Sequence, residues 1–224
     1  MPKTLTELID SREPAWPQVS AWIAQAKTPV QVLEASPRRA ADVLLNLQVT
    51  TRSPMGAIAF QTGGLLIDHG WLRVLGGGCG RMEGDLARWN GLGRAPLIEA
   101  VPGALFIAHD VLGGFFALDG GALGEGKGIA HYLAPDTLEW ESTGKGYSEL
   151  IAWMLMGDLQ RFYGDHRWEG WQEEVQALSP DRGFSFYPPL FAKEEPGLVR
   201  SRKDVPMAEL LALNLDFAAQ LTAQ

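Results

Sequence analysis

The sequence contains very little cysteine. Its 224 residues include a single one, Cys79, so the chain can form neither an internal disulfide nor a metal centre built from several cysteines. Cys79 lies in the glycine-rich stretch LGGGCGRMEGD. A reactive thiolate needs a neighbouring base, cation or helix start, and no local motif ties a histidine to this cysteine. We therefore interpret the stretch as a loop between two elements.

Long apolar runs and an excess of positive charge are also absent. No apolar run approaches the length of about 20 residues that a membrane-spanning helix needs, so we expect no membrane partner. The first residues, MPKTLTELIDSREP, lack the apolar centre of a secretion signal, which predicts a cytoplasmic protein. Lys and Arg number 19 against 27 Asp and Glu, a formal net charge of −8. Such a surface repels phosphate backbones, so we expect no nucleic-acid partner and consider a basic protein partner instead.

The sequence has no phosphate-binding loop, although the stretch STGKGYSEL invites the comparison. A loop of that kind needs a glycine five residues before the Gly-Lys pair and a hydroxyl residue after the lysine. Glu139 occupies the first position here and Gly146 the last. We therefore predict no nucleotide at this place, and no cofactor elsewhere. The glycines are interpreted as a turn that leads from a strand into a helix.

The hydrophobic period changes twice along the chain, and these changes predict the fold class. Ser36 followed by Pro37 indicates a helix start. Short apolar runs between Val49 and Leu75, separated by Ser-Pro, the Gly63-Gly64 pair and Gly70, indicate consecutive strands joined by tight turns. Further strands are predicted at VQVLEA (30–35), LFIAH (105–109), FFAL (115–118), GIAHYL (128–133) and TLEW (137–140).

From Tyr147 to Phe162 the apolar residues return to a period of about 3.6, which predicts one long helix. A second helix is predicted from Trp168 to Leu178 and a last one from Pro206. The stretch GFSFYPPLFAKEEPG (183–197) is predicted to be a loop, because two consecutive prolines disfavour regular structure. No strand-helix-strand rhythm repeats, so we predict an α+β fold: a mainly antiparallel sheet with flanking helices.

Histidines and aspartates gather near the ends of the predicted strands. His69, His109 and His131 occupy such positions, and Asp68 and Asp110 adjoin the first two. If these strands are neighbours, an imidazole-carboxylate cluster could bind a metal or serve acid-base chemistry. The alternative is a set of structural polar contacts. The spacing fits no known metal motif, so we assign neither a metal ligand nor a catalytic residue.

Trp71 and Arg73 complete the candidate site. They lie two residues apart and therefore share one face of their strand. Tryptophan and arginine are favoured anchors of protein interfaces, but we expect Trp71 to be buried in the core, with Arg73 at its rim. The candidate polar cluster or interface thus comprises Asp68, His69, Trp71, Arg73, His109 and Asp110.

Two resemblances can be drawn from longer stretches. The run LQVTTRSPMGAIAFQTGGLLIDHGWLRVLGGG resembles an uncharacterised bacterial family of unknown function over nearly the whole chain, which implies no activity. More loosely, DVLGGFFALDGG, GIAHYLAPDTLEW and SELIAWMLMGDL resemble the SUKH superfamily, which is similar to the fungal Smi/Knr cell-wall regulators and to many bacterial immunity proteins. This likeness implies a SUKH-like core at about 36–178, followed by an extension at about 181–224. We expect both to belong to a single domain, 1–224.

The functional expectation follows from this likeness, the acidic balance and the lack of a catalytic motif. We expect a non-enzymatic protein-binding module, with an immunity protein against a basic toxin as its most specific form. The alternative is a small-ligand or metal-dependent enzyme that uses His69, His109 and Asp110. A structural subunit that works only as a homo-oligomer is a third alternative.

Overall fold

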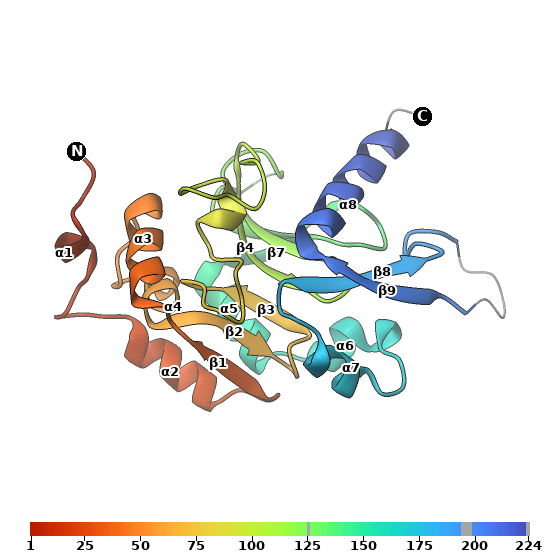
Figure 1. The fold of residues 1–224 in the computed structure, drawn as a ribbon, viewed down its shortest axis with the longest axis horizontal. Helices are drawn as coiled ribbons and strands as arrows, with labels where there is room; N and C mark the ends of the chain where they lie inside the picture. Colours follow the sequence, from red (N-terminus) through yellow and green to blue (C-terminus); the bar gives the residue numbers. More distant parts are fainter. Residues whose placement is uncertain (125, 194–198, 223–224) are drawn as a thin grey trace.

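The computed structural model describes residues 1–124, 126–193 and 199–222, and it has an α+β architecture (Figure 1). Within these residues seven strands form one antiparallel sheet in chain order, so each strand pairs with the next. Short connections favour this order. The strands are β1 (Val30–Glu34), β2 (Thr62–Ile67), β3 (Leu72–Leu75), β4 (Ala104–Asp110), β5 (Phe115–Asp119), β6 (Ile129–Leu133) and β7 (Trp140–Gly146).

The amino-terminal helices and the helix after β7 form a layer against this sheet. They are α1 (Leu5–Leu8), α2 (Trp16–Ala24), α3 (Pro37–Leu47), α4 (Pro54–Gln61) and α5 (Tyr147–Met156). The central three, α2, α4 and α5, contact one another and reach the sheet through β2 and β7, while α3 and α1 pack outside α4. Short elements follow: the 3-10 turns η1 (Arg88–Asn90) and η2 (Gly164–His166), and the helices α6 (Leu159–Tyr163) and α7 (Trp171–Ala177).

The carboxy-terminal part forms a hairpin of β8 (Arg182–Tyr187) and β9 (Ser201–Pro206), followed by α8 (Met207–Thr222). Figure 1 shows α8 extending away from the sheet beside this hairpin. The backbone N–H of Phe184 donates to the Val111 carbonyl at 2.7 Å. Phe184, Met207 and Leu210 belong to the same buried apolar cluster as the sheet. The predicted division into a core and an extension remains a prediction, but the two parts share buried packing.

Several local predictions are confirmed. VQVLEA forms β1, the Ser36-Pro37 pair begins α3, and DVLGG connects β4 and β5 as a hairpin. The α+β class and the mainly antiparallel sheet are confirmed as well. These signals were short-range, in that each depended on residues next to one another in the chain.

The predicted run of strands from Val49 to Leu75 is wrong at its start. Pro54–Gln61 is the helix α4, which begins with the same Ser-Pro signature as α3: the Ser53 Oγ accepts a hydrogen bond from the Gly56 N–H at 3.1 Å. The Gly63-Gly64 pair, predicted as a turn, lies inside β2. A Cβ at Gly63 would lie 2.9 Å from the Cβ of Cys79, so the glycine is needed where the loop at 76–82 packs on the strand.

Three predictions in the second half also need correction. The helix from Tyr147 is interrupted at Gly157 and Asp158 and continues as α6. The stretch predicted as a loop at 183–197 begins with β8, whose partner β9 was not predicted; residues 194–197 lie outside the described part. The strand predicted at TLEW instead starts at Trp140 and includes the Gly-Lys-Gly stretch, with Gly144 at φ 66° beside a break in the register. The strand therefore runs directly into α5.

Candidate functional site

Four strands bring one side chain each into a lateral row. The register pairs Gln31 with Leu66, Leu66 with Arg73, and Arg73 with His109. Directly paired residues of antiparallel strands project from the same face of the sheet. The row therefore runs from the edge strand β1, where Gln31 is exposed, to β4, where His109 is buried.

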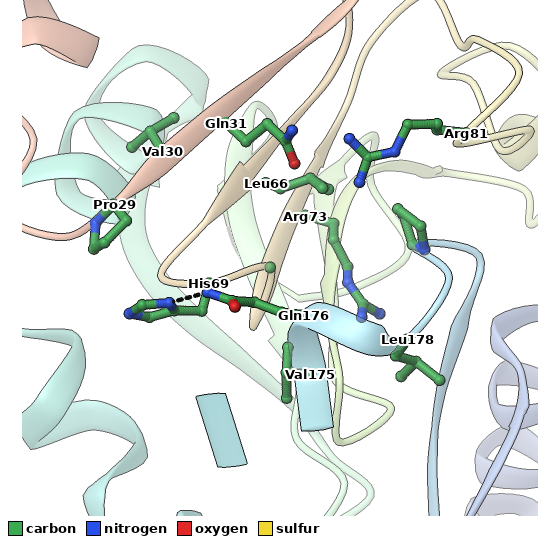
Figure 2. A pocket seen from close by; sticks show the side chains of 12 residues that line it. Pro29, Val30, Gln31, Leu66, His69, Arg73, Arg81, Val175, Gln176 and Leu178 are labelled. Atoms are coloured by element: carbon green, nitrogen blue, oxygen red, sulfur yellow. Dashed lines mark hydrogen bonds between the residues drawn. The ribbon is translucent and has the colours of Figure 1, made fainter. Parts of the chain in front are cut away.

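A crevice of about 340 Å³ lies over the outer part of this row (Figure 2). Besides Gln31, Leu66 and Arg73, its lining residues come from around the start of β1, the β2–β3 turn, the loop after β3, the end of α7 and the segment that follows α7: Pro29, Val30, His69, Gly70, Arg81, Val175, Gln176, Leu178 and Pro180. Figure 2 shows Arg81 on the opposite side of the crevice from His69, whose Nδ1 forms a hydrogen bond with the Gln176 side-chain amide. The crevice is therefore built by segments far apart in the chain.

Arg73 is the buried cation of this crevice. Arg73 is 1% exposed, and its Nη1 donates a hydrogen bond to the Arg182 carbonyl at 2.5 Å. Its buried Nε has no hydrogen-bond partner, and no carboxylate of the described residues lies within ion-pair distance. Burial lowers the pKa of Arg73 to about 10, although the negative charges of Asp110 and Asp181 act to raise it. The crevice wall thus holds a buried positive charge that has no carboxylate partner in the part of the chain that the structure describes.

His109 lies beside Arg73 at the inner end of the row. His109 is 1% exposed, and neither ring nitrogen has a hydrogen-bond partner among the described residues. The centroid of its ring lies 5.5 Å from that of Trp89 and 6.1 Å from that of Phe115. Burial, and after it the charge of Arg73, lowers the pKa of His109 well below its usual range. His109 is therefore neutral near pH 7. In the described part of the chain, the buried indole Nε1 of Trp89 also lacks a hydrogen-bond partner.

Asp110 follows His109 but faces the other side of the sheet, because consecutive strand residues alternate. Its carboxylate accepts hydrogen bonds from the hydroxyls of Tyr132 (2.7 Å) and Tyr163 (3.0 Å) and from backbone N–H groups of the β4–β5 turn. Burial raises the pKa of Asp110, although these hydrogen bonds oppose the shift. The structure therefore does not bring His109 and Asp110 together, and Asp110 has a structural role in the hairpin.

Asp68 and Trp71 form a third group at the β2–β3 turn. Asp68 makes an ion pair with Arg167, and both side chains are almost buried. The Arg167 guanidinium lies 5.2 Å from the ring centroid of Trp71 and 4.4 Å from that of Trp171. Trp71 is completely buried, as predicted. The predicted rim position of Arg73 is wrong, because the crevice wall encloses it.

His69 and His131 occupy separate places. The His69 ring meets the edge of Trp171 at 5.7 Å and reaches the crevice mouth. His131 lies on β6, where its Nδ1 is 3.3 Å from the Ile129 carbonyl. In the described part of the chain, no group of three or more His, Cys, Asp and Glu side chains is placed to hold a metal ion. None of the helices described is long and apolar enough to cross a membrane.

Sequence reasoning missed several residues of the crevice. Gln31 and Leu66 carry no signal of their own, since only the strand register places them beside Arg73. Gln176 comes from the last turn of α7, more than 100 residues away from its partner His69. Arg81 lies in the glycine-rich stretch around Cys79, and no motif there indicates a ligand-binding role. A correct sheet order, with its register, would have identified the row.

The fold and the crevice define an α+β protein built on a seven-stranded antiparallel meander with a cationic crevice at one edge. The chain belongs to the family described as protein of unknown function DUF2625, whose model matches residues 5–210. It is similar to an uncharacterised protein of Escherichia coli (strain K12), YbfG, with 42% identity over 208 residues that cover 93% of this chain and 94% of the relative.

An uncharacterised protein of Haemophilus influenzae is 37% identical over 188 residues, which cover 84% of this chain and 82% of the relative. No solved structure matches the chain. The predicted membership of an uncharacterised bacterial family is thus confirmed, while the SUKH likeness stays a prediction.

Proposed function

We propose that this protein binds a small organic anion in the crevice beside Arg73. The observation that supports the proposal is the buried guanidinium itself, which has no carboxylate partner among the described residues. Buried charges are normally paired, because removing an ion from water is costly. The planar fork of an arginine matches the oxygens of a carboxylate or phosphate. A bound anion would therefore supply the missing partner.

The other lining residues support the same ligand charge. The chain carries 27 acidic residues, yet no aspartate or glutamate of the described residues lines the crevice. Arg81 adds a second cation at the mouth, and His69 and Gln176 provide polar groups. The remaining walls are mostly apolar. A mostly apolar concave site with few polar groups is typical of small-molecule binding.

The proposal is tested by thermal unfolding of the purified protein with sodium acetate or inorganic phosphate at constant ionic strength. A ligand that binds only the folded state raises stability by about RT ln(1 + [L]/Kd). We expect a saturable rise for the natural protein, and none for Arg73→Gln. Arg94→Gln is the matched control, because it removes the same charge from an exposed loop outside the crevice. Equal stabilisation of Arg73→Gln, or none of the natural protein by either anion, would contradict the proposal.

A protein-binding role, with an immunity protein against a basic toxin as its specific form, is the second candidate. The net charge of −8 supports it, since opposite charges steer association and salt slows that step. Affinity capture from the source organism, followed by mass spectrometry, tests it. Recovery of a basic protein whose binding weakens with salt would support the role, and capture of acidic proteins alone would count against it.

An enzyme that uses His69, His109 and Asp110 has less support, because His109 and Asp110 face opposite sides of the sheet.

A further inference from the structure

We infer that the anion is the carboxylate of an elongated apolar acid, which enters at the edge strand β1 and places its head group at Arg73. This inference rests on the proposed function and names the ligand class of the same crevice. The inference is based on how the exposure and polarity of the side chains change along the row. Gln31 is exposed at the edge, Leu66 is 7% exposed in the middle, and Arg73 is 1% exposed at the inner end.

The row also sets the length of the ligand. Gln31, Leu66 and Arg73 lie on three neighbouring strands, and neighbouring strands are about 4.8 Å apart. The path from the mouth to the guanidinium therefore crosses two strand spacings, roughly 10 Å. The crevice volume of about 340 Å³ is close to the lower end of the range for small-molecule sites, so a small elongated molecule fits better than a polymer.

The chemistry of the walls favours a carboxylic acid over inorganic phosphate. Leu66 forms part of the floor, and Val175 and Leu178 supply apolar side chains around it. A compact phosphate at Arg73 would leave these surfaces in contact with water only. An alkyl chain behind a carboxylate would cover them, and burying apolar surface is favourable. The cation at the inner end fixes the direction, with the head inward and the tail toward β1.

Varying the length of the alkyl chain tests whether the ligand is an elongated carboxylic acid. Acetate, butyrate, hexanoate, octanoate and decanoate are titrated into the natural protein by isothermal calorimetry, with inorganic phosphate and 1-hexanol as comparisons. Each buried methylene should tighten binding about fourfold. The gain should stop once the chain emerges beside β1. Hexanol should bind at least tenfold more weakly than hexanoate, because it lacks the charge that pairs with Arg73.

Two substitutions locate the binding path. Gln31→Trp places a large ring at the mouth and should abolish the dependence on chain length, so that octanoate binds no more tightly than butyrate. Val32→Trp is the matched control, because Val32 neighbours Gln31 on β1, points to the other face and is 40% exposed. It should leave the whole series unchanged. Circular dichroism of both variants checks that the fold is retained.

The outcomes separate this inference from the proposed function. If acetate and phosphate bind in an Arg73-dependent manner but added methylenes give no gain, the anion site stands and the elongated acid is wrong. The same conclusion follows if Gln31→Trp and Val32→Trp behave alike. If no member of the series binds and phosphate does not bind either, both the inference and the proposed function fail.

Discussion

His109 should make the folded state lose stability as the pH falls from 7.5 to 5.5. The buried imidazole cannot take up a proton readily, because burial and the neighbouring Arg73 charge lower its pKa well below 6.5. In the unfolded chain the same side chain has a pKa near 6.5. Below that pH the unfolded state therefore binds one proton more than the folded state, and stability falls with falling pH.

The size of this effect follows from one proton. With an unfolded pKa near 6.5 and a folded pKa below the window, the loss between pH 7.5 and 5.5 is about 1.4 kcal/mol. Asp110 works in the opposite direction, because its raised pKa makes the folded state more stable as the pH falls. A variant that changes only His109 keeps this contribution of Asp110. The contribution therefore cancels when the pH dependence of the variant is compared with that of the natural protein.

The assay is urea unfolding of the natural protein, His109→Phe and His109→Gln at pH 7.5 and pH 5.5. Both variants should lose about 1.4 kcal/mol less than the natural protein over this interval, whatever their absolute stability. His109→Phe should also be close to the natural protein at pH 7.5, since the two unpartnered ring nitrogens leave no orphaned group behind. If both variants keep the natural pH dependence within about 0.5 kcal/mol, the account of a buried neutral imidazole is wrong.

Two further substitutions test, by urea unfolding, the polar contacts of Asp110 and of Asp68. Asp110→Ala should cost at least about 3 kcal/mol, because it orphans two tyrosine hydroxyls and two backbone N–H groups; Asp110→Asn keeps an acceptor for the backbone and should cost clearly less. Equal losses for the two variants would refute the hydrogen-bond argument. Arg167→Met should cost about 3 kcal/mol, since it leaves the almost buried Asp68 carboxylate unpaired. The double variant Asp68→Asn, Arg167→Met should recover part of that loss, and a purely additive result would contradict the pairing.

The predictable part of the fold was the part encoded by neighbouring residues. The Ser36-Pro37 helix start and the glycine-centred β4–β5 hairpin follow from local capping and turn chemistry. Ser53-Pro54 carries the same signature but was interpreted as a turn, because α4 is apolar on most sides and shows no clear helical period. β8 was missed because Pro188-Pro189 follows it directly, and β9 because it is exposed and polar.

The candidate site was predictable only in part, for a geometric reason. Alternation along a strand already implies that His109 and Asp110 face opposite sides, so this part of the proposed cluster could have been excluded from the sequence. The pairing of Arg73 with Leu66 and Gln31 could not have been foreseen, because it depends on strand order and register. The closure of the crevice by α7 and the segment after it depends on tertiary packing, which carries no local signal.

The central claim is that Arg73 binds an anion, and nuclear magnetic resonance of arginine side chains tests this claim most directly. The Nε–H signal of Arg73 is assigned by its disappearance in Arg73→Gln and followed while acetate is added at constant ionic strength. The account predicts a saturable shift of this signal, with no comparable shift for the exposed Arg94. An Arg73 signal that does not move while the backbone spectrum stays unchanged would contradict it.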